Sequence, residues 1–201
     1  MKEALYVLGD VVHTLQRERG CASIFLYSKG EIFLERMLFQ FKETGNALLS
    51  FHEAFERWEK QHCLEQAEIN KLADIAALCE DLPRFHKNIT KKKMSVSDAI
   101  SFYSHKLIGP MIQLMVEIAF NMKDSNPTQV SAYNSFLQWK ERIGLERAIG
   151  ARGFIKNSFQ DKEFTERVIF LLGEQENYKN TYFALASAEQ NELVEKALEI
   201  E

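Results

Sequence analysis

The sequence predicts an all-α protein of elongated antiparallel helical bundles, and two observations support that fold class. Apolar side chains recur at steps of three and four residues along nearly the whole chain, whereas no alternating strand pattern extends over any length. Only 9 Gly and 3 Pro occur among 201 residues, so long helices joined by few loops are expected. Helices of about 25 residues would each be about 40 Å long at 1.5 Å per residue.

Three long helices are expected in the first half of the chain. The first extends from Lys2 to Tyr27, and Gly30 in the turn after it suits the left-handed cap position. The second extends from about Glu31 to Lys60. The third covers about Glu65 to Thr90, with a kink or break at Pro83, because proline lacks the backbone N–H that a helix interior needs.

Four further helices are expected in the second half of the chain. The segment Lys123 to Pro127 is the clearest linker between them. This many helices exceeds one four-helix bundle, so two four-helix bundles that share long helices are expected, within a single domain over residues 1–201. The expected helices are Ser97 to Asn121 with a bend at Gly109-Pro110, Pro127 to Asn157, Asp161 to Leu172, and Glu174 to Glu199.

Composition argues against several classes of protein. A net charge of −4 does not favour a nucleic-acid-binding surface. The most apolar stretch, Leu107 to Met122, is too short and too polar for a membrane span. An odd number of widely spaced cysteines, with no signal peptide before them, favours a cytoplasmic protein.

Enzyme signatures are scarce in this sequence. It contains no phosphate-binding glycine loop, dinucleotide fingerprint or Gly-x-Ser-x-Gly elbow. A single Glu-x-x-His pair, Glu59 and His62, does not suffice for a di-iron bundle, and no two histidines are spaced for zinc. We therefore expect no catalytic residue, metal or cofactor, and a protein that is not an enzyme.

Two arginines occupy positions where a helical bundle should have apolar residues. Arg19 lies on the apolar seam of the first helix, and Arg147 lies on a seam of the fifth. A guanidinium directed into a core is costly unless an anion meets it. The two seams are Leu5, Leu8, Val12, Leu15, Arg19, Ala22 and Leu26, and Tyr133, Phe136, Lys140, Ile143, Arg147, Gly150 and Phe154.

Two interpretations of these arginines remain open. In the first, they form internal ion pairs, Arg19 with Glu146 or Arg147 with Glu18, in a helical adaptor that binds other proteins. In the second, both guanidiniums converge on a small planar oxyanion, which their rigid forks suit. Small residues nearby, at Gly20, Gly144 and Gly150, would let a helix or a ligand approach closely.

Around these residues the chain resembles the nitrate- and nitrite-sensing (NIT) domain family over about residues 5 to 190. The most specific motifs surround the two arginines, and weaker ones lie between them. They are Leu15-Gln16-Arg17-Glu18-Arg19-Gly20, Leu82-Pro83-Arg84, Ser97-Asp98-Ala99-Ile100-x-x-Tyr103, and Lys140-Glu141-x-x-Gly144-x-Glu146-Arg147-Ala148-x-Gly150-Ala151-x-Gly153-Phe154.

The resemblance implies a regulatory domain that binds nitrate or nitrite between helices and signals by helix rearrangement. By position, Arg19 and Arg147 are the first choices as ligands, Arg17 and Arg84 the second, and Arg152 a weaker one. Family members usually precede an output module, so the expected partners are the anion and a separate or missing output module; a homodimer is compatible with this. Another small anion, such as a carboxylate, is the further alternative.

Overall fold

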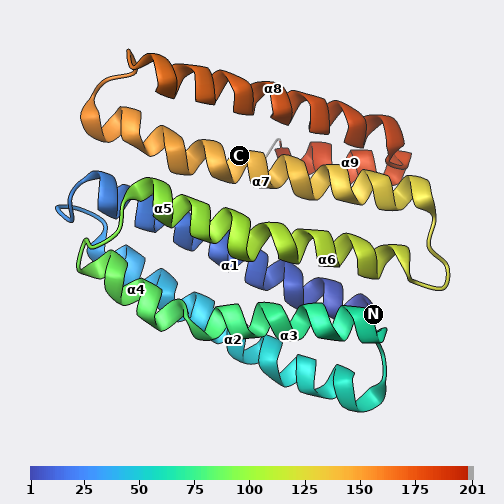
Figure 1. The fold of residues 1–201 in the computed structure, drawn as a ribbon. Helices are drawn as coiled ribbons and strands as arrows, with labels where there is room; N and C mark the ends of the chain where they lie inside the picture. Colours follow the sequence, from blue (N-terminus) through green and yellow to red (C-terminus); the bar gives the residue numbers. More distant parts are fainter. Residues whose placement is uncertain (199–201) are drawn as a thin grey trace.

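The computed structural model describes residues 1–198, and all the secondary structure of that range is helical (Figure 1). This confirms the predicted all-α class. The elements are α1 (Lys2–Tyr27), α2 (Leu34–Gln61), α3 (Gln66–Glu80), α4 (Leu82–Thr90), α5 (Val96–Ser101), the π-helical segment η1 (Phe102–Ile108), α6 (Gly109–Phe120), α7 (Pro127–Lys156), α8 (Lys162–Leu185) and α9 (Ala188–Leu198).

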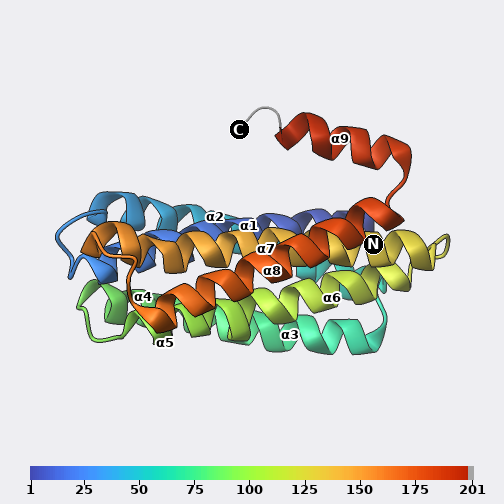
Figure 2. The same ribbon diagram turned by 90° about the horizontal axis from the view of Figure 1, so that it is seen from above.

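The long helices lie nearly parallel to one another, and α1 lies among them (Figures 1 and 2). Helix α1 packs against α2, against α7 and against the continuous rod α5–η1–α6. Helix α8 forms a hairpin with α7, and α9 projects from its end (Figure 2). The α1–α2–α7 corner is therefore a place where segments distant in sequence meet. None of the described helices is long and apolar enough to cross a membrane.

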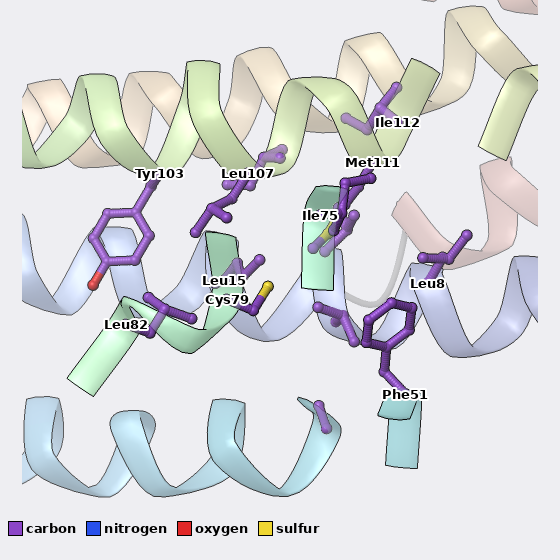
Figure 3. Close-up of a cluster of buried hydrophobic side chains, with 14 of the residues drawn as sticks. Leu8, Leu15, Phe51, Ile75, Cys79, Leu82, Tyr103, Leu107, Met111 and Ile112 are labelled. Atoms are coloured by element: carbon purple, nitrogen blue, oxygen red, sulfur yellow. The ribbon is translucent and has the colours of Figure 1, made fainter. Parts of the chain in front are cut away.

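The main core lies between α1, α2, α3 and the α5–η1–α6 rod (Figure 3). It contains fully buried side chains such as Leu8, Phe51 and Leu107. The predicted seam of α1 is confirmed, because its members from Leu8 onward are buried. A smaller cluster joins α5, α7 and α8 and contains Ile100, Ala148, Ile149, Phe164 and Leu171.

Two local predictions are confirmed by the backbone. Gly30 has a φ of +87° and its N–H donates to the carbonyl of Phe25, which ends α1. Helix α3 ends at Glu80 and α4 begins at Leu82, so the chain does break beside Pro83.

Where a bend was predicted at Gly109-Pro110, the helical rod continues and contains a π-helical segment. Seven residues from Phe102 to Ile108 form wide turns directly before Pro110. Proline has no N–H to donate to the preceding turn, so the regular α-helical ladder is interrupted there. A Cβ on Gly109 would lie only 3.0 Å from the carbonyl oxygen of Ser104, so a side chain at this position would be close to the backbone of the π-helical segment.

The predicted helix break near Gly173 is wrong. Helix α8 continues through Gly173 to Leu185, and the chain breaks instead before α9. A glycine weakens a helix by about 1 kcal/mol but does not end it without a further signal. That signal lies at Ser187, whose hydroxyl accepts from the Gln190 N–H while the Gln190 side chain accepts from the Ser187 N–H. The predicted end at Glu199 falls outside the described residues.

Candidate functional site

A groove of about 670 Å³ lies between α1, α2 and α7. Each helix contributes one row of side chains to it, because residues three and four apart share a helix face. From α1 come His13, Gln16, Arg17, Gly20, Cys21 and Ile24; from the start of α2 and the residue before it come Phe33, Arg36, Phe39 and Gln40; from α7 come Lys140, Ile143, Gly144 and Arg147.

The lining of this groove is positively charged. Arg17, Arg36, Lys140 and Arg147 all line it, and none of the Asp and Glu residues among 1–198 does. Burial lowers the pKa of the Lys140 ammonium, although the nearby carboxylate of Glu141 opposes that shift. An arrangement of this kind favours an anion, because cations held together in partly desolvated surroundings repel one another until a negative charge joins them.

The pKa of His13 is affected by the positive charges of the groove. Its pKa lies below the usual 6.5, first because burial disfavours the imidazolium and then because Lys140 and Arg17 repel it. A bound anion would offset that repulsion and raise the pKa of His13.

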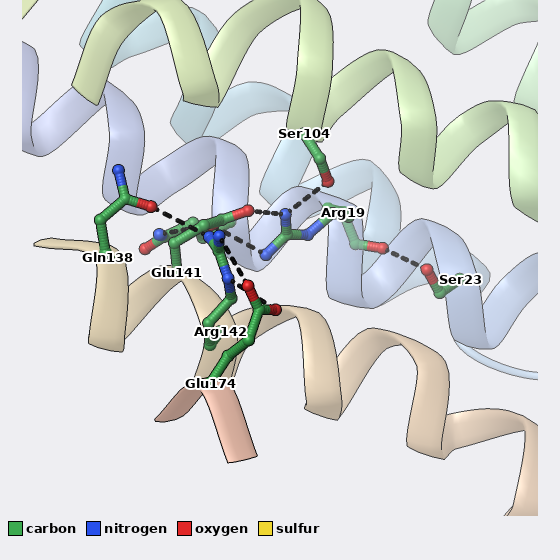
Figure 4. Close-up of polar contacts among 8 residues, drawn as sticks. Arg19, Ser23, Ser104, Gln138, Glu141, Arg142 and Glu174 are labelled. Atoms are coloured by element: carbon green, nitrogen blue, oxygen red, sulfur yellow. Dashed lines mark hydrogen bonds and ion pairs between the residues drawn. The ribbon is translucent and has the colours of Figure 1, made fainter. Parts of the chain in front are cut away.

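Arg19 lies behind the wall of the groove and is completely buried. Its Nη1 donates to Glu141 Oε1 at 2.5 Å and to Ser104 Oγ at 2.7 Å, and its Nη2 donates to Glu141 Oε2 at 3.1 Å (Figure 4). Gln16 Nε2 completes the cluster with a hydrogen bond of 2.9 Å to Glu141 Oε2. The predicted internal ion pair of Arg19 exists, but its partner is Glu141 and not Glu146, which accepts from Gln175 instead.

The side chains of Arg17 and Arg147 are exposed and line the groove, which corrects the predicted burial of Arg147. The prediction placed the buried seam of α7 one residue away from its true position. The buried or half-buried row is Leu137, Glu141, Gly144, Ala148 and Ala151, which also follow steps of four and three; in this row, Glu141 and Gly144 contact side chains of α1. The small residues among them were the sequence signal that could have identified this seam and, with it, Glu141.

Arg17 reaches the groove without any bend in its helix. Arg17 lies two positions before Arg19 on a helix that is continuous from Lys2 to Tyr27. The groove lies on the face that Arg17 occupies, while Arg19 points to the interior. Arg84 is exposed on α4 and does not line the groove, and Arg152 pairs with Asp161.

Gly144 allows Arg19 to pack against α7. A Cβ at this position would lie 2.8 Å from Arg19 Nη2, closer than atoms can approach. The expected close approach is therefore confirmed at Gly144. It is absent at Gly20 and Gly150, where a Cβ would meet nothing within 4 Å.

Glu18, the neighbour of Arg19, is fully buried on a different side of α1. Its Oε1 accepts hydrogen bonds from the Tyr103 hydroxyl at 2.6 Å and from His86 Nε2 at 2.7 Å. The His86 ring stacks on Phe41 with centroids 3.7 Å apart. Burial and the charge of Glu18 raise the pKa of Tyr103 well above 10, so the phenol remains a donor. This network joins α1 to α4 and η1, and it was not predicted from the sequence.

The described residues contain no group of three or more His, Cys, Asp or Glu side chains that could hold a metal ion. The polar side chains that line the groove are those of Arg, Lys, His, Gln and Cys residues.

Comparison with known proteins identifies the family of this chain. A family model described as nitrate and nitrite sensing matches residues 10–200. The nitrate regulatory protein of Klebsiella oxytoca is 26% identical over 199 residues, which cover 96% of this chain and 49% of that protein. The solved structure of the NasR transcription antiterminator is similar with a TM-score of 0.81 at 23% identity, over 94% of this chain and 51% of that one.

The chain thus spans about half the length of both relatives, and the likeness to the antiterminator establishes the fold alone. The family model extends over nearly all of the chain. On that match, the chain belongs to the nitrate- and nitrite-sensing family and is a regulatory sensing domain.

Proposed function

We propose that nitrate or nitrite binds in the groove between α1, α2 and α7, with Arg17 and Arg147 as its principal ligands. The observation that carries this proposal is the lining itself, in which cationic side chains from three helices gather around one groove. Arg17 and Arg147 stand on α1 and α7, so an anion between them would link these two helices.

The chemistry of nitrate suits this groove. Guanidinium groups present planar forks of donors that match planar oxyanions, and they are weakly hydrated compared with ammonium. Phe33, Phe39 and Ile143 supply an apolar part of the lining, which a weakly hydrated monoanion tolerates better than a strongly hydrated dianion.

Binding would act by changing the electrostatic interaction between the helices, and no covalent bond would be made or broken. Without a ligand, the cations on α1, α2 and α7 repel one another, and an anion turns that repulsion into attraction. Because α8 packs along α7, a shift of α7 would reach the C-terminal helices. From there the signal would pass to an output module, carried by the same protein or by a partner; pairing of two copies stays a prediction.

Thermal unfolding across an anion titration tests this proposal. The salts are nitrate, nitrite, formate, chloride and sulfate at matched ionic strength. Ligand at 100 times its dissociation constant should stabilise the folded state by about 2.7 kcal/mol, a shift in Tm that is easily measured. A saturable shift for nitrate or nitrite supports the proposal, and a saturable shift for formate alone would favour a carboxylate sensor.

Two variants locate the site. Arg147→Gln should abolish the nitrate shift, because it removes a lining guanidinium, while Arg84→Gln on the exposed surface of α4 should keep it. If neither arginine changes the shift, the anion binds elsewhere. If wild-type protein shows no saturable shift with any salt, the adaptor interpretation is favoured, and the buried Arg19–Glu141 pair then has a structural role.

A further inference from the structure

The Arg19–Glu141 pair lies directly behind the floor of the groove. Gly144 lines the groove, and a Cβ on it would lie 2.8 Å from Arg19 Nη2 and 4.0 Å from Glu141 Oε2. Gln16 also lines the groove and holds Glu141 Oε2 with its amide. The pair therefore lies next to two residues of the groove lining, Gly144 and Gln16.

Both carboxylate oxygens of Glu141 are used on the guanidinium of Arg19, so the two charges cancel. The side chain of Arg19 has no solvent exposure and that of Glu141 has 6%, so water screens the charge of either residue poorly. Arg19 Nε is buried without a hydrogen-bond partner, and Glu141 is the carboxylate with which Arg19 forms an ion pair. The positive charge of Arg19 would otherwise add to the four cations of the lining.

We propose that Glu141 is a specificity-determining residue of the anion site. It holds Arg19 in a neutral pair, so a bound anion interacts with the charges of the lining but not with that of Arg19. This lowers the affinity of the groove for every anion, and it lowers it more for dianions than for monoanions. The inference rests on the proposed function, since it concerns the same groove.

The test is a set of variants that changes the charge of the pair in unit steps. Glu141→Gln gives the pair a net charge of +1, and Arg19→Gln gives it a net charge of −1. The double variant keeps the net charge of the pair at zero. Dissociation constants are measured by calorimetry for nitrate and for sulfate at matched ionic strength. Glu174→Gln is the matched control, because Glu174 pairs with Arg142 on the α8 side of α7, outside the groove lining.

Glu141→Gln should bind nitrate about tenfold or more tightly than wild type, because one repulsive unit charge is removed from a poorly solvated position. A dianion experiences twice that repulsion, so the gain for sulfate should be the square of the gain for nitrate. Arg19→Gln should bind both anions more weakly, and the double variant should bind nitrate within about threefold of wild type. Glu174→Gln should behave as wild type.

Several results would overturn the inference. If Glu141→Gln binds nitrate no more tightly than wild type, Glu141 does not limit affinity. If the double variant loses nitrate binding, Arg19 contacts the anion directly and is not a neutralised charge. Should Glu141→Gln fail to fold, the double variant is tested in its place. Its dissociation constant for nitrate should then lie within about threefold of the wild-type value. A wild-type protein that binds none of these anions would instead refute the proposed function, before any variant is compared.

Discussion

At the scale of single residues, the site depends on where charges are placed relative to the helix surface. Arg17 and Arg19 are two positions apart on α1, yet one lines the groove and the other is buried behind it. Residues two apart face different sides of a helix, so neighbouring arginines of one motif have different environments. Burial alone would make Arg19 a destabilising charge, and Glu141 prevents this by pairing with it.

Substitution of Gly144 tests the packing of Arg19. Gly144→Ala should destabilise the protein by about 1–3 kcal/mol, because its Cβ would overlap Arg19 Nη2 and force the buried pair to move. Chemical denaturation measures this change. Gly150→Ala is the control on the same helix: a Cβ there meets nothing within 4 Å, so stability should rise by up to about 1 kcal/mol. Equal effects at both positions would contradict the packing argument.

The lowered pKa of His13 predicts how nitrate binding depends on pH. Protonation of His13 adds a positive charge to the groove, so nitrate affinity should rise as the pH falls from 7.5 to 5.5. Without ligand the sign is opposite: the folded state disfavours the proton, so the stabilising contribution of His13 is present above pH 6.5 and is lost below it.

Calorimetric titrations of nitrate at several pH values measure the first effect. His13→Gln should flatten the pH dependence of the dissociation constant, since nitrate itself does not titrate in this range. A variant as pH-dependent as wild type would assign the effect to another group.

At the scale of helices, the helical class and the approximate positions of most helices were predictable from the sequence. The bounds of α1 were predicted because its seam is regular and Gly30 supplies a clear end. The seam of α7 was misplaced by one residue because two rows of that helix, one beginning with Tyr133 and one with Leu137, both follow steps of three and four. Periodicity within one helix does not decide which row meets a neighbour. The groove was not predictable for that reason, because its lining is defined by how three helices meet.

Helix caps should differ in their effect on stability according to what the helix packs against. Asn126 caps α7, its side chain accepting from the Thr128 and Gln129 N–H groups, and Ser187 caps α9. Asn126→Ala should lower global stability by about 1 kcal/mol, since α7 is packed against α1, α6 and α8. Ser187→Ala should increase hydrogen exchange in α9 with little change in Tm, because α9 contains no buried residue. A matching fall in Tm for Ser187→Ala would mean that α9 supports the bundle.

At the scale of the whole molecule, nitrate should change protection in a limited set of helices. Hydrogen exchange should slow in the middle of α1, the first turns of α2 and the middle of α7, which carry the groove lining. Helix α3 serves as an internal reference, because it packs on α6 and α2 and contributes nothing to the groove. Slowed exchange in α3 without a change in α1 or α7 would place the anion elsewhere.

The pair between Arg19 and Glu141 also has a consequence for the order in which the chain assembles. The two residues are separated by 122 positions, and every residue of α2 to α6 lies between them. A chain synthesised only as far as α6 has its apolar core but no carboxylate from α7 for Arg19, so the face of α1 that meets α7 is left with an unneutralised cation. Completion of the bundle therefore depends on a late, long-range docking step, in which one carboxylate both neutralises that face and fixes the register of α7 along α1.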